Sequence, residues 1–474
     1  MAPSTSPVGF DFGGGATRIY FVAAADGQIH ELSYNPSTLW VQSPALTSIG
    51  VAAGSRPAGF RYGTAGAARV YFVAPGDGAI HELGFNSASG WAVSAAMTPS
   101  VRPGTGPTAF QFGSAGAARV YFVAAADGAI HELGYNPASG WAVSPALTSA
   151  VAPGTSPVGF DFGGGAARIY FVAAADDQIH ELSYNPSTGW VQSSALTTTG
   201  VAAGGTPVAF PYGDGGAVRV YFVAASDDAI HELGFNPATG WGVSGPLTGA
   251  VATGTSPIGY PLGYQGVRVY FVGRGDSELH QLAFNSSTGW SQGVAMSTAV
   301  ATGTSPTGFG FGECNQRIYF VASSDSAIHE LSYNGPNQTE CLSDLEPAAA
   351  TAPAGPAPAG TAPVTISPKP RKGHVRVRIT MSWTWEGAHT RLRRVAFVRL
   401  PRKASIVVSC RGQGCPKRRW SSRPGQSKRL RRALSGRVFR AGDRLLITIS
   451  VPREISERAQ IRIRQGRKPV ASLR

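Results

Sequence analysis

A repeat of about 50 residues constrains this chain more than any other feature. The motif Arg-x-Tyr-Phe-Val occurs seven times at intervals of 49 to 51 residues, starting at Arg18, Arg69, Arg119, Arg168, Arg219, Arg268 and Arg317. Repeated units of this length stack into solenoids or propellers, because one unit cannot bury its apolar face alone. The secondary structure of one unit therefore decides the fold of the whole region.

Each unit contains four short segments with strand-like composition. In unit 1 they are residues 8–12, 18–23, 28–34 and 40–45, separated by Gly- and Pro-containing turns. Asp26-Gly27 is a strong hairpin signal between the second and third segments. No segment has apolar residues at helical spacing over three turns, which excludes a helical solenoid. Four strands per unit predict an all-β fold, a β-propeller with one blade per unit.

The seventh unit differs from the others at its end. After Tyr333 it reads NGPNQTECLSDLEP and lacks the Trp-led fourth strand, so we expect seven blades with the last one incomplete. Cys314 and Cys341 occur only in this unit and flank its second and third strands. A disulfide between them would pin the open end of the ring, and two unpaired thiols are the alternative.

Charge divides the chain into two parts. The net charge of +14 would suggest a nucleic-acid-binding protein, but residues up to Ser367 carry −12, with eleven Arg and no Lys, whereas residues from Pro368 carry +26. Residues 347–370 are nearly all Ala, Pro, Gly and Thr, a composition typical of a semi-rigid linker. We therefore expect a propeller at 1–346, a linker at 347–370 and a basic module at 371–474.

The basic module has the pattern of a small β-sandwich. The stretches VRVRITMSW, ASIVVSC, RLLITISV and AQIRIRQG alternate or run apolar between Pro and Gly. Cys410 and Cys415 flank a Gly-containing turn, which predicts a local disulfide, and no further ligands at zinc-site spacing are present. This CRGQGCP hairpin resembles those of C-terminal β-modules of secreted actinobacterial proteins. We expect the charge to bind a polyanionic cell-wall polymer or acidic glycan, with nucleic acid as second choice and simple solubility as the remaining explanation.

Polar residues are sparse in the repeat, and three of them recur in fixed register. An Arg is followed after 13 residues by Glu and after nine more by Trp, and an aromatic residue lies three positions after the Glu. In units 1 to 5 these residues are Arg18, Glu31, Tyr34 and Trp40; Arg69, Glu82, Phe85 and Trp91; Arg119, Glu132, Tyr135 and Trp141; Arg168, Glu181, Tyr184 and Trp190; and Arg219, Glu232, Phe235 and Trp241. Unit 6 has Arg268, Gln281 and Trp290, and unit 7 has Arg317 and Glu330 without a Trp.

These residue types suit the recognition of a sugar. Arg and Glu on neighbouring strands of a hairpin present donors beside an acceptor, and a sugar hydroxyl needs both. An aromatic ring covers the apolar face of a sugar. An ion pair with a packed Trp could equally be a device that stitches the blades together, repeated because the blade is repeated.

The pattern Arg-[Val/Ile]-Tyr-Phe, Ile-His-Glu-Leu-x-[Tyr/Phe] and Gly-Trp resembles the fungal fucose-specific lectin family, typified by the Aleuria aurantia lectin. The resemblance covers residues 6–333, about 70% of the chain. It implies a propeller whose inter-blade pockets bind fucose through an Arg, a Glu and a Trp per blade, with a nearby aromatic residue against the methyl group of the sugar. Carried over by position, it groups Arg18, Glu31, Tyr34 and Trp40 in one pocket, and likewise in units 2 to 5. Members usually have six blades and one residue fewer between Arg and Glu, and here Leu39 replaces the Gly before Trp40.

Two units depart from the pattern in ways that weaken a site. The neutral Gln281 cannot make the charge-assisted hydrogen bonds of a carboxylate, so the unit 6 site is expected to be weak. The unit 7 site is expected to be the weakest because the Trp is missing. We therefore expect about five working sites. A non-catalytic propeller scaffold for protein–protein interaction or surface adhesion is the alternative function.

Neither a metal centre nor an active site is expected. Seven His residues precede the Glu or Gln of each unit and so point to the opposite sheet face, one per blade, which favours structural packing over metal ligation: His30, His81, His131, His180, His231, His280 and His329. Acids specific to single units form no evident pair, and no sialidase box, GxSxG or HExxH motif occurs. We expect no enzyme activity and no cofactor.

The expected location is extracellular or at the cell surface. Four Cys in two plausible pairs and a Pro/Ala-rich linker favour export. The first residues, MAPSTSPVGF, do not have the basic and apolar regions of a signal peptide. A signal lying upstream, a nonclassical route and an internal protein are the three explanations. No apolar run is long enough for a membrane-spanning helix.

Overall fold

The computed structural model divides the chain into two domains, Met1–Ala348 and Ala349–Arg474. In the first domain the structure describes residues 1–63, 66–113, 116–213, 216–262, 266–285, 289–311 and 315–333. In the second domain it describes residues 360–366, 378–386, 389–398, 401, 403–411, 415, 419–422, 430, 434, 437–440, 443–451, 457–464 and 467–473.

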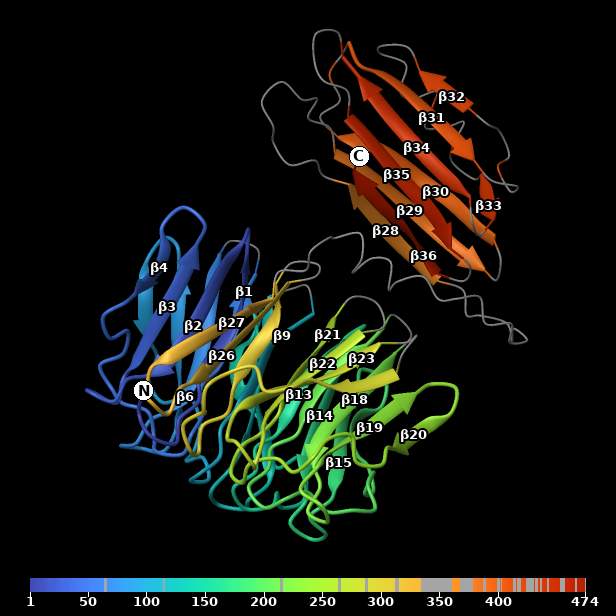
Figure 1. Ribbon diagram of the computed structural model, residues 1–474. Coiled ribbons are helices and arrows are strands. Elements are labelled where there is room, and N and C mark those ends of the chain that lie inside the picture. Colours follow the sequence, from blue (N-terminus) through green and yellow to red (C-terminus); the bar gives the residue numbers. More distant parts are fainter. Residues whose placement is uncertain are drawn as a thin grey trace. The chain divides into compact units, whose positions relative to one another are not determined.

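The first domain is the predicted propeller (Figure 1). Six units each form a four-stranded antiparallel sheet in chain order, and the described part of unit 7 forms a three-stranded one. Units 1 to 3 contain β1 (Val8–Gly13), β2 (Ala16–Val22), β3 (Ile29–Asn35), β4 (Leu39–Gln42), β5 (Ala58–Tyr62), β6 (Ala67–Val73), β7 (Ile80–Asn86), β8 (Gly90–Val93), β9 (Thr108–Phe112), β10 (Ala117–Val123), β11 (Ile130–Asn136) and β12 (Gly140–Val143). Units 4 and 5 contain β13 (Val158–Gly163), β14 (Ala166–Val172), β15 (Ile179–Asn185), β16 (Gly189–Gln192), β17 (Val208–Tyr212), β18 (Ala217–Val223), β19 (Ile230–Asn236) and β20 (Gly240–Val243). Units 6 and 7 contain β21 (Ile258–Leu262), β22 (Gly266–Val272), β23 (Leu279–Asn285), β24 (Gly289–Gln292), β25 (Thr307–Phe311), β26 (Asn315–Val321) and β27 (Ile328–Tyr333).

The first strands of the seven units form a closed ring. Each of them packs against the first strand of the next unit, and β1 packs against both β5 and β25. Unit 7 meets unit 1 through hydrogen bonds: the Met1 amino group donates to the Ser326 carbonyl at 2.7 Å, and the Ser305 N–H donates to the Ser6 hydroxyl at 2.9 Å. The ring therefore has seven blades, one more than the number usual in the family that the repeat resembles.

The core lies between neighbouring blades. The second strand of each unit is its most buried strand, and the Tyr of Arg-x-Tyr-Phe-Val is at most 2% exposed in every unit. The core clusters join two consecutive units; one contains Tyr170 of unit 4 together with Val218 and Val220 of unit 5. Burial between blades explains why the repeat motif is apolar on both faces of this strand.

One turn is strained in unit 1 alone. The residue before the repeat Trp has a positive φ of 71° to 80° in units 2 to 6, where it is Gly, and a φ of 59° in unit 1, where it is Leu39. A non-Gly residue in this region costs about 1–3 kcal/mol. The Leu39 side chain is 62% exposed, so no burial offsets that cost.

The second domain has two antiparallel sheets. One has the order β28-β29-β30-β33 and the other β32-β31-β34-β35-β36. The strands are β28 (Gly360–Ile366), β29 (Arg378–Glu386), β30 (His389–Val398), β31 (Ser405–Arg411), β32 (Arg419–Ser422), β33 (Val438–Arg440), β34 (Arg444–Ser450), β35 (Glu457–Arg464) and β36 (Arg467–Leu473). Leu392 and Phe439 of the first sheet share a buried core with Ile406, Ile447 and Ile461 of the second, which gives the expected sandwich.

Strand structure in this half of the chain extends into the segment predicted as a linker. β28 lies inside the segment predicted as a linker at 347–370 and pairs with β29 along its length, so ordered structure begins earlier than the composition suggests. The Thr- and Val-containing sequence GTAPVTI can form this strand despite its Pro.

Cys410 and Cys415 form the predicted disulfide. Cys314 and Cys341 lie outside the described residues. No helix among the described residues has the length and apolarity needed to cross a membrane.

Candidate functional site

The recurring Arg and Glu meet on one face of each hairpin. They stand diagonally across the second and third strands, since Tyr71 pairs with Glu82 and Arg69 with Gly84 in the strand register. The Arg Nε lies 3.1–3.6 Å from the Glu Oε1 in six units: Arg18–Glu31, Arg69–Glu82, Arg119–Glu132, Arg168–Glu181, Arg219–Glu232 and Arg317–Glu330. The predicted pairing across the hairpin is confirmed.

The residue two positions after the Glu tunes this pair. Units 2, 3 and 5 have Gly there and Arg–Glu distances of 3.1, 3.3 and 3.3 Å, whereas units 1, 4 and 7 have Ser and distances of 3.6, 3.5 and 3.6 Å. A Cβ added at Gly84, Gly134 or Gly234 would lie 2.9, 2.6 or 3.0 Å from the Glu Oε1. The absence of a side chain therefore lets the carboxylate move towards the guanidinium.

A buried Tyr orients the carboxylate. In units 2 to 5 and 7 the Tyr hydroxyl of the repeat motif donates to the Glu Oε2 at 2.5–2.8 Å, from Tyr71, Tyr121, Tyr170, Tyr221 and Tyr319. Burial disfavours the charged carboxylate and raises the pKa of Glu31, Glu132 and Glu181, and the nearby Arg opposes this rise. In unit 1 the Tyr20 hydroxyl has no hydrogen-bond partner among the described residues. A partly desolvated, oriented carboxylate is a strong hydrogen-bond acceptor.

The guanidinium is also held from several sides. In unit 3 the Arg119 Nη1 donates to the carbonyls of Ala118 and Tyr135, both at 2.9 Å. The guanidinium carbon lies 4.3–4.6 Å from the centre of an aromatic ring on the first strand in six units, on Phe12, Tyr62, Phe112, Phe162, Tyr212 and Phe311. These contacts fix the position of the Arg before any ligand binds.

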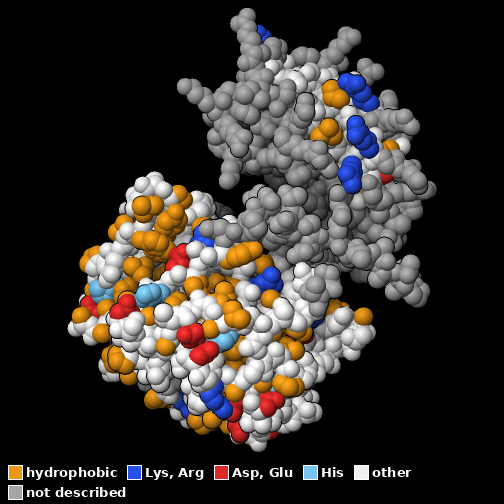
Figure 2. Space-filling model, viewed as in Figure 1, with side chains coloured by type: hydrophobic (Ala, Val, Ile, Leu, Met, Phe, Trp, Pro, Cys, Tyr) orange, Lys and Arg blue, Asp and Glu red, His pale blue; other side chains and the backbone are white. Residues whose placement is uncertain are grey.

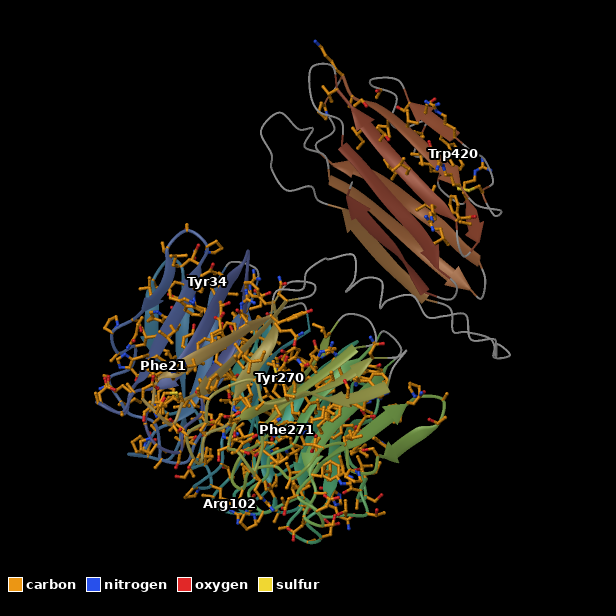
Figure 3. The ribbon with its side chains drawn as sticks, in the orientation of Figure 1. Phe21, Tyr34, Arg102, Tyr270, Phe271 and Trp420 are labelled. Atoms are coloured by element: carbon orange, nitrogen blue, oxygen red, sulfur yellow. A yellow bond between two sulfur atoms is a disulfide. The ribbon has the colours of Figure 1, made fainter. Side chains whose placement is uncertain are left out.

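The Trp that completes each group comes from the next unit. The Tyr of one unit makes an edge-to-face contact with the Trp of the following unit at 5.7–6.0 Å, in the pairs Tyr20–Trp91, Tyr71–Trp141, Tyr121–Trp190, Tyr170–Trp241, Tyr221–Trp290 and Tyr319–Trp40. The grouping of Arg18, Glu31, Tyr34 and Trp40 in one pocket, and its equivalents in units 2 to 5, is therefore wrong. The ring centres of Tyr34, which is labelled in Figure 3, and Trp40 lie 5.3 Å apart. Both residues complete the site that contains Arg317 and Glu330 of unit 7.

An open pocket lies at the interface between units 2 and 3. Unit 2 contributes Tyr62, Arg69, Tyr71 and Glu82, and unit 3 contributes Ala118, Tyr135 and Trp141. Its wall thus combines a fixed guanidinium, an oriented carboxylate and four aromatic rings. Ala118 is the residue just before the repeat Arg, and its small side chain leaves this space free.

Composite assembly changes which interfaces are complete. Arg, Glu and the following unit's Trp are all present at six interfaces: units 1–2, 2–3, 3–4, 4–5, 5–6 and 7–1. The defects that the sequence assigned to two sites, Gln281 of unit 6 and the missing Trp of unit 7, fall on a single interface. Six complete sets of these residues are therefore present, whereas the sequence led us to expect about five working sites.

The interface between units 6 and 7 is closed by the protein itself. Gln316 of unit 7 occupies the position of Ala118 and is 2% exposed. Its side-chain oxygen accepts hydrogen bonds from the hydroxyls of Tyr270 and Tyr260, and the Gln281 amide donates to Tyr270 at 2.6 Å. Leu262 replaces the aromatic residue beneath the Arg. Figure 3 labels Tyr270, the centre of this network.

The seven His residues lie on the other face, as predicted. Each His Nε2 lies 2.9–3.0 Å from the carboxylate of the Asp four residues earlier. The His30 ring also packs on Phe21 at 5.7 Å. Figure 2 shows His atoms beside carboxylates on the visible face of the first domain. Among the described residues, only Cys410, Cys415 and Asp443 meet the spacing of a metal site, and the two cysteines form the disulfide.

Sequence reasoning missed two parts of the site. The first is the hydrogen-bonding Tyr of the repeat motif, which looked like a core residue only. The second is the aromatic residue beneath the Arg, which stands just before a Gly in the first strand of six units. Its replacement by Leu262 in unit 6, where Gln281 also departs, was an available signal.

Residues 165–397 match the family model described as the fungal fucose-specific lectins. The match begins within unit 4, and units 1 to 3 carry the same recurring residues. The comparison with curated proteins found no match. The resemblance of the C-terminal hairpin to actinobacterial modules gains no support from these comparisons.

Among solved structures, the chain is similar to a fucose-specific lectin from Aleuria aurantia, with 19% identity, a TM-score of 0.46, and coverage of 59% of this chain and 91% of that one. It is similar to the SapL1 lectin in complex with alpha methyl fucoside, with 23% identity, a TM-score of 0.44, and coverage of 61% and 95%. It is also similar to a puromycin hydrolase, with 12% identity, a TM-score of 0.44, and coverage of 80% and 58%. Scores this low carry no functional weight.

Proposed function

We propose that this chain, whose residues 165–397 match the model of the fungal fucose-specific lectin family, binds fucose or fucosylated glycans at six composite sites between its blades. Each site combines the Arg and Glu of one unit with the Trp and neighbouring aromatic residue of the next. The Arg donates to sugar hydroxyls, the Glu accepts from them, and the aromatic rings cover the apolar face of the sugar.

The open pocket between units 2 and 3 carries this proposal. Its Arg69 and Glu82 lie 3.1 Å apart and are anchored by Phe85, Tyr62 and Tyr71, so they present fixed groups to a ligand. A device that only stitched blades together would need no open space beside the ion pair. Preorganised polar groups lower the entropy cost of binding a small ligand.

Several weak sites on one rigid ring suit dense glycan surfaces. Linked sites raise apparent affinity by about 10²–10⁴ without new contacts when they can be engaged together. The alternative function, a scaffold for protein–protein interaction, would use the same surface but would not require free monosaccharide to bind. The match to the lectin family model and the similar polar groups in nearly every unit favour a binding protein without catalytic activity.

Isothermal titration of the full chain with methyl α-fucoside tests the proposal. We expect a stoichiometry near six, which falls by one in Arg69→Ala. Arg268→Ala is a matched control, because it removes the same Arg from the closed interface and should leave the stoichiometry unchanged. No heat at millimolar sugar would overturn the fucose assignment, and an equal effect of both variants would overturn the assignment of sites.

We propose a separate role for the second domain, the binding of an anionic polymer outside the cell. Arg411 and Arg444 are exposed and directly opposite each other in the strand register, and Arg419 is exposed on the neighbouring strand β32. Figure 2 shows several of the described Lys and Arg side chains of this domain close together on the visible face. Like charges opposite each other are destabilising, and a polyanion would relieve that repulsion. Heparin-column retention that falls with salt would support this role, and salt-independent retention would contradict it.

A further inference from the structure

A ring of hydroxyl groups surrounds the axis of the propeller. This ring is separate from the sites between the blades. It is built from the residue that precedes a Pro before the first strand of each unit. The ring residues in unit order are Ser6, Arg56, Gly106, Ser156, Thr206, Ser256 and Ser305. Five are hydroxyl residues, and units 2 and 3 break the pattern with Arg and Gly.

Hydrogen bonds link this ring from unit to unit. The N–H groups of Gly106, Ser156, Thr206, Ser256 and Ser305 donate to the hydroxyls of the following units at 2.9–3.2 Å. Because every bond joins consecutive blades, the chain of bonds follows the circle of inner strands around the axis. Each of the five hydroxyl oxygens thus accepts an N–H, and within the described residues none has an acceptor for its own proton.

Arg56 reaches across this ring. Its Nη2 donates to the Ser305 Oγ at 2.9 Å, from unit 2 to unit 7, past the intervening Ser6 of unit 1. The contact joins two members of the ring that are not neighbours, so the guanidinium lies at the ring and not at a blade interface. Gly106 gives the room, since a Cβ there would lie 2.8 Å from the Arg56 carbonyl oxygen.

The Arg56 guanidinium has no countercharge in the described part of the chain. It takes part in no ion pair there, and burial lowers its pKa with no contribution from a carboxylate. A partly buried, unpaired charge is costly, and the group has four further N–H donors to satisfy. Ring hydroxyls with free protons are donors as well.

We propose that the axis of the propeller binds a small inorganic anion of the size of chloride, held by Arg56 and the ring hydroxyls. All convergent groups are donors, as a halide requires, and the cation supplies the charge that neutral hydroxyls lack. The anion would tie units 2 and 7 to unit 1, the place where the two ends of the ring meet. The site is independent of the sugar sites, which lie between blades.

Bromide serves as the probe. In crystals of the full chain grown with bromide, we expect an anomalous peak on the axis within hydrogen-bonding distance of Arg56. In solution, replacing gluconate by chloride at constant ionic strength should raise the melting temperature saturably. The peak and the chloride response should both disappear in Arg56→Ser, which restores the residue found in four other units.

Arg102→Ala is the charge-matched control. Arg102, labelled in Figure 3, donates to the Val151 carbonyl at 2.8 Å, so the variant removes a positive charge without changing the ring. It should keep the full chloride response. Absence of the bromide peak in the wild-type protein, or an unchanged chloride response in Arg56→Ser, would overturn the proposal. If Arg56→Ser fails to fold, the wild-type bromide map decides alone. Sugar titration should be the same in chloride and gluconate, which separates this test from that of lectin function.

Discussion

The interface between units 2 and 3 and the interface between units 6 and 7 have the same strand arrangement but differ in their side chains, which leave the first open and close the second. The first presents Arg69, Glu82 and Trp141 around an open pocket. In the second, Gln316 fills the equivalent space and bonds to Tyr270. The comparison shows that the state of a site depends on residues from two units, so a defect in one unit is felt at only one of its two interfaces.

The residue just before the repeat Arg, Ala118 in unit 3 and Gln316 in unit 7, is the difference between the two interfaces that is expected to have the largest effect. Ala118→Gln introduces the side chain of the closed interface into the open one, where it should compete for the Tyr71 hydroxyl and fill the pocket. We expect the loss of one site in six, seen as a drop in fucoside stoichiometry by titration calorimetry. Ala118→Val is the matched control, because units 5 and 6 have Val there in otherwise complete sets. A stoichiometry unchanged by Ala118→Gln would refute the role assigned to Gln316.

The reverse change tests what the closed interface gains. Gln316→Ala removes the acceptor of the buried Tyr270 and Tyr260 hydroxyls, and an unsatisfied buried polar group costs about 1–3 kcal/mol. We expect unfolding free energy to fall by that amount in urea denaturation, with no new sugar site because unit 7 has no Trp. A variant as stable as the wild type would show that the network does not stabilise the ring.

Much of the fold was predictable from the repeat, because four short strands per unit leave few alternatives to a propeller. The Arg–Glu pair was predictable too, since a 13-residue spacing with an Asp-Gly turn brings both to one hairpin face. The partner of Trp141 was not, because sequence order says which residues share a blade and not which blades face each other. The role of Gln316 could be recognised only once it was known that unit 7 faces unit 6 at this interface. In the sequence alone it is a single-residue difference.

A smaller effect distinguishes the interface between units 7 and 1 from the others. Leu39 holds a left-handed conformation next to Trp40, where units 2 to 6 have Gly. Leu39→Gly should raise the unfolding free energy by about 1 kcal/mol, the lower end of the cost of such strain, because Gly also gains freedom in the unfolded chain. The reciprocal Gly140→Leu should lower it by at least as much, and denaturant midpoints compare the two. A destabilised Leu39→Gly would mean that this conformation is not strained.

Acidification should weaken sugar binding before it lowers the stability of the fold. The loss of affinity should be smallest at neutral pH and grow as the pH falls. Burial raises the pKa of Glu31, Glu132 and Glu181, so their carboxylates protonate at a higher pH than an ordinary Glu, near 4.3. A protonated Glu loses its ion pair with Arg, and affinity should fall by up to about tenfold per pH unit below that pKa. Fucoside titrations from pH 7.5 to 4.5 measure this.

Stability should respond in the opposite sense over the same range. A carboxyl whose folded pKa is raised binds more protons in the folded state, so its contribution to stability grows as pH falls. Asp77 and Asp127, which accept hydrogen bonds from backbone N–H groups and from His, have a lowered pKa, so their contribution is lost only as pH falls through that lower value. Affinity should therefore weaken before the melting temperature does. A parallel loss of both would place the acid sensitivity in the ring itself, and an affinity that stays constant down to pH 4.5 would remove the charged Glu from the binding site.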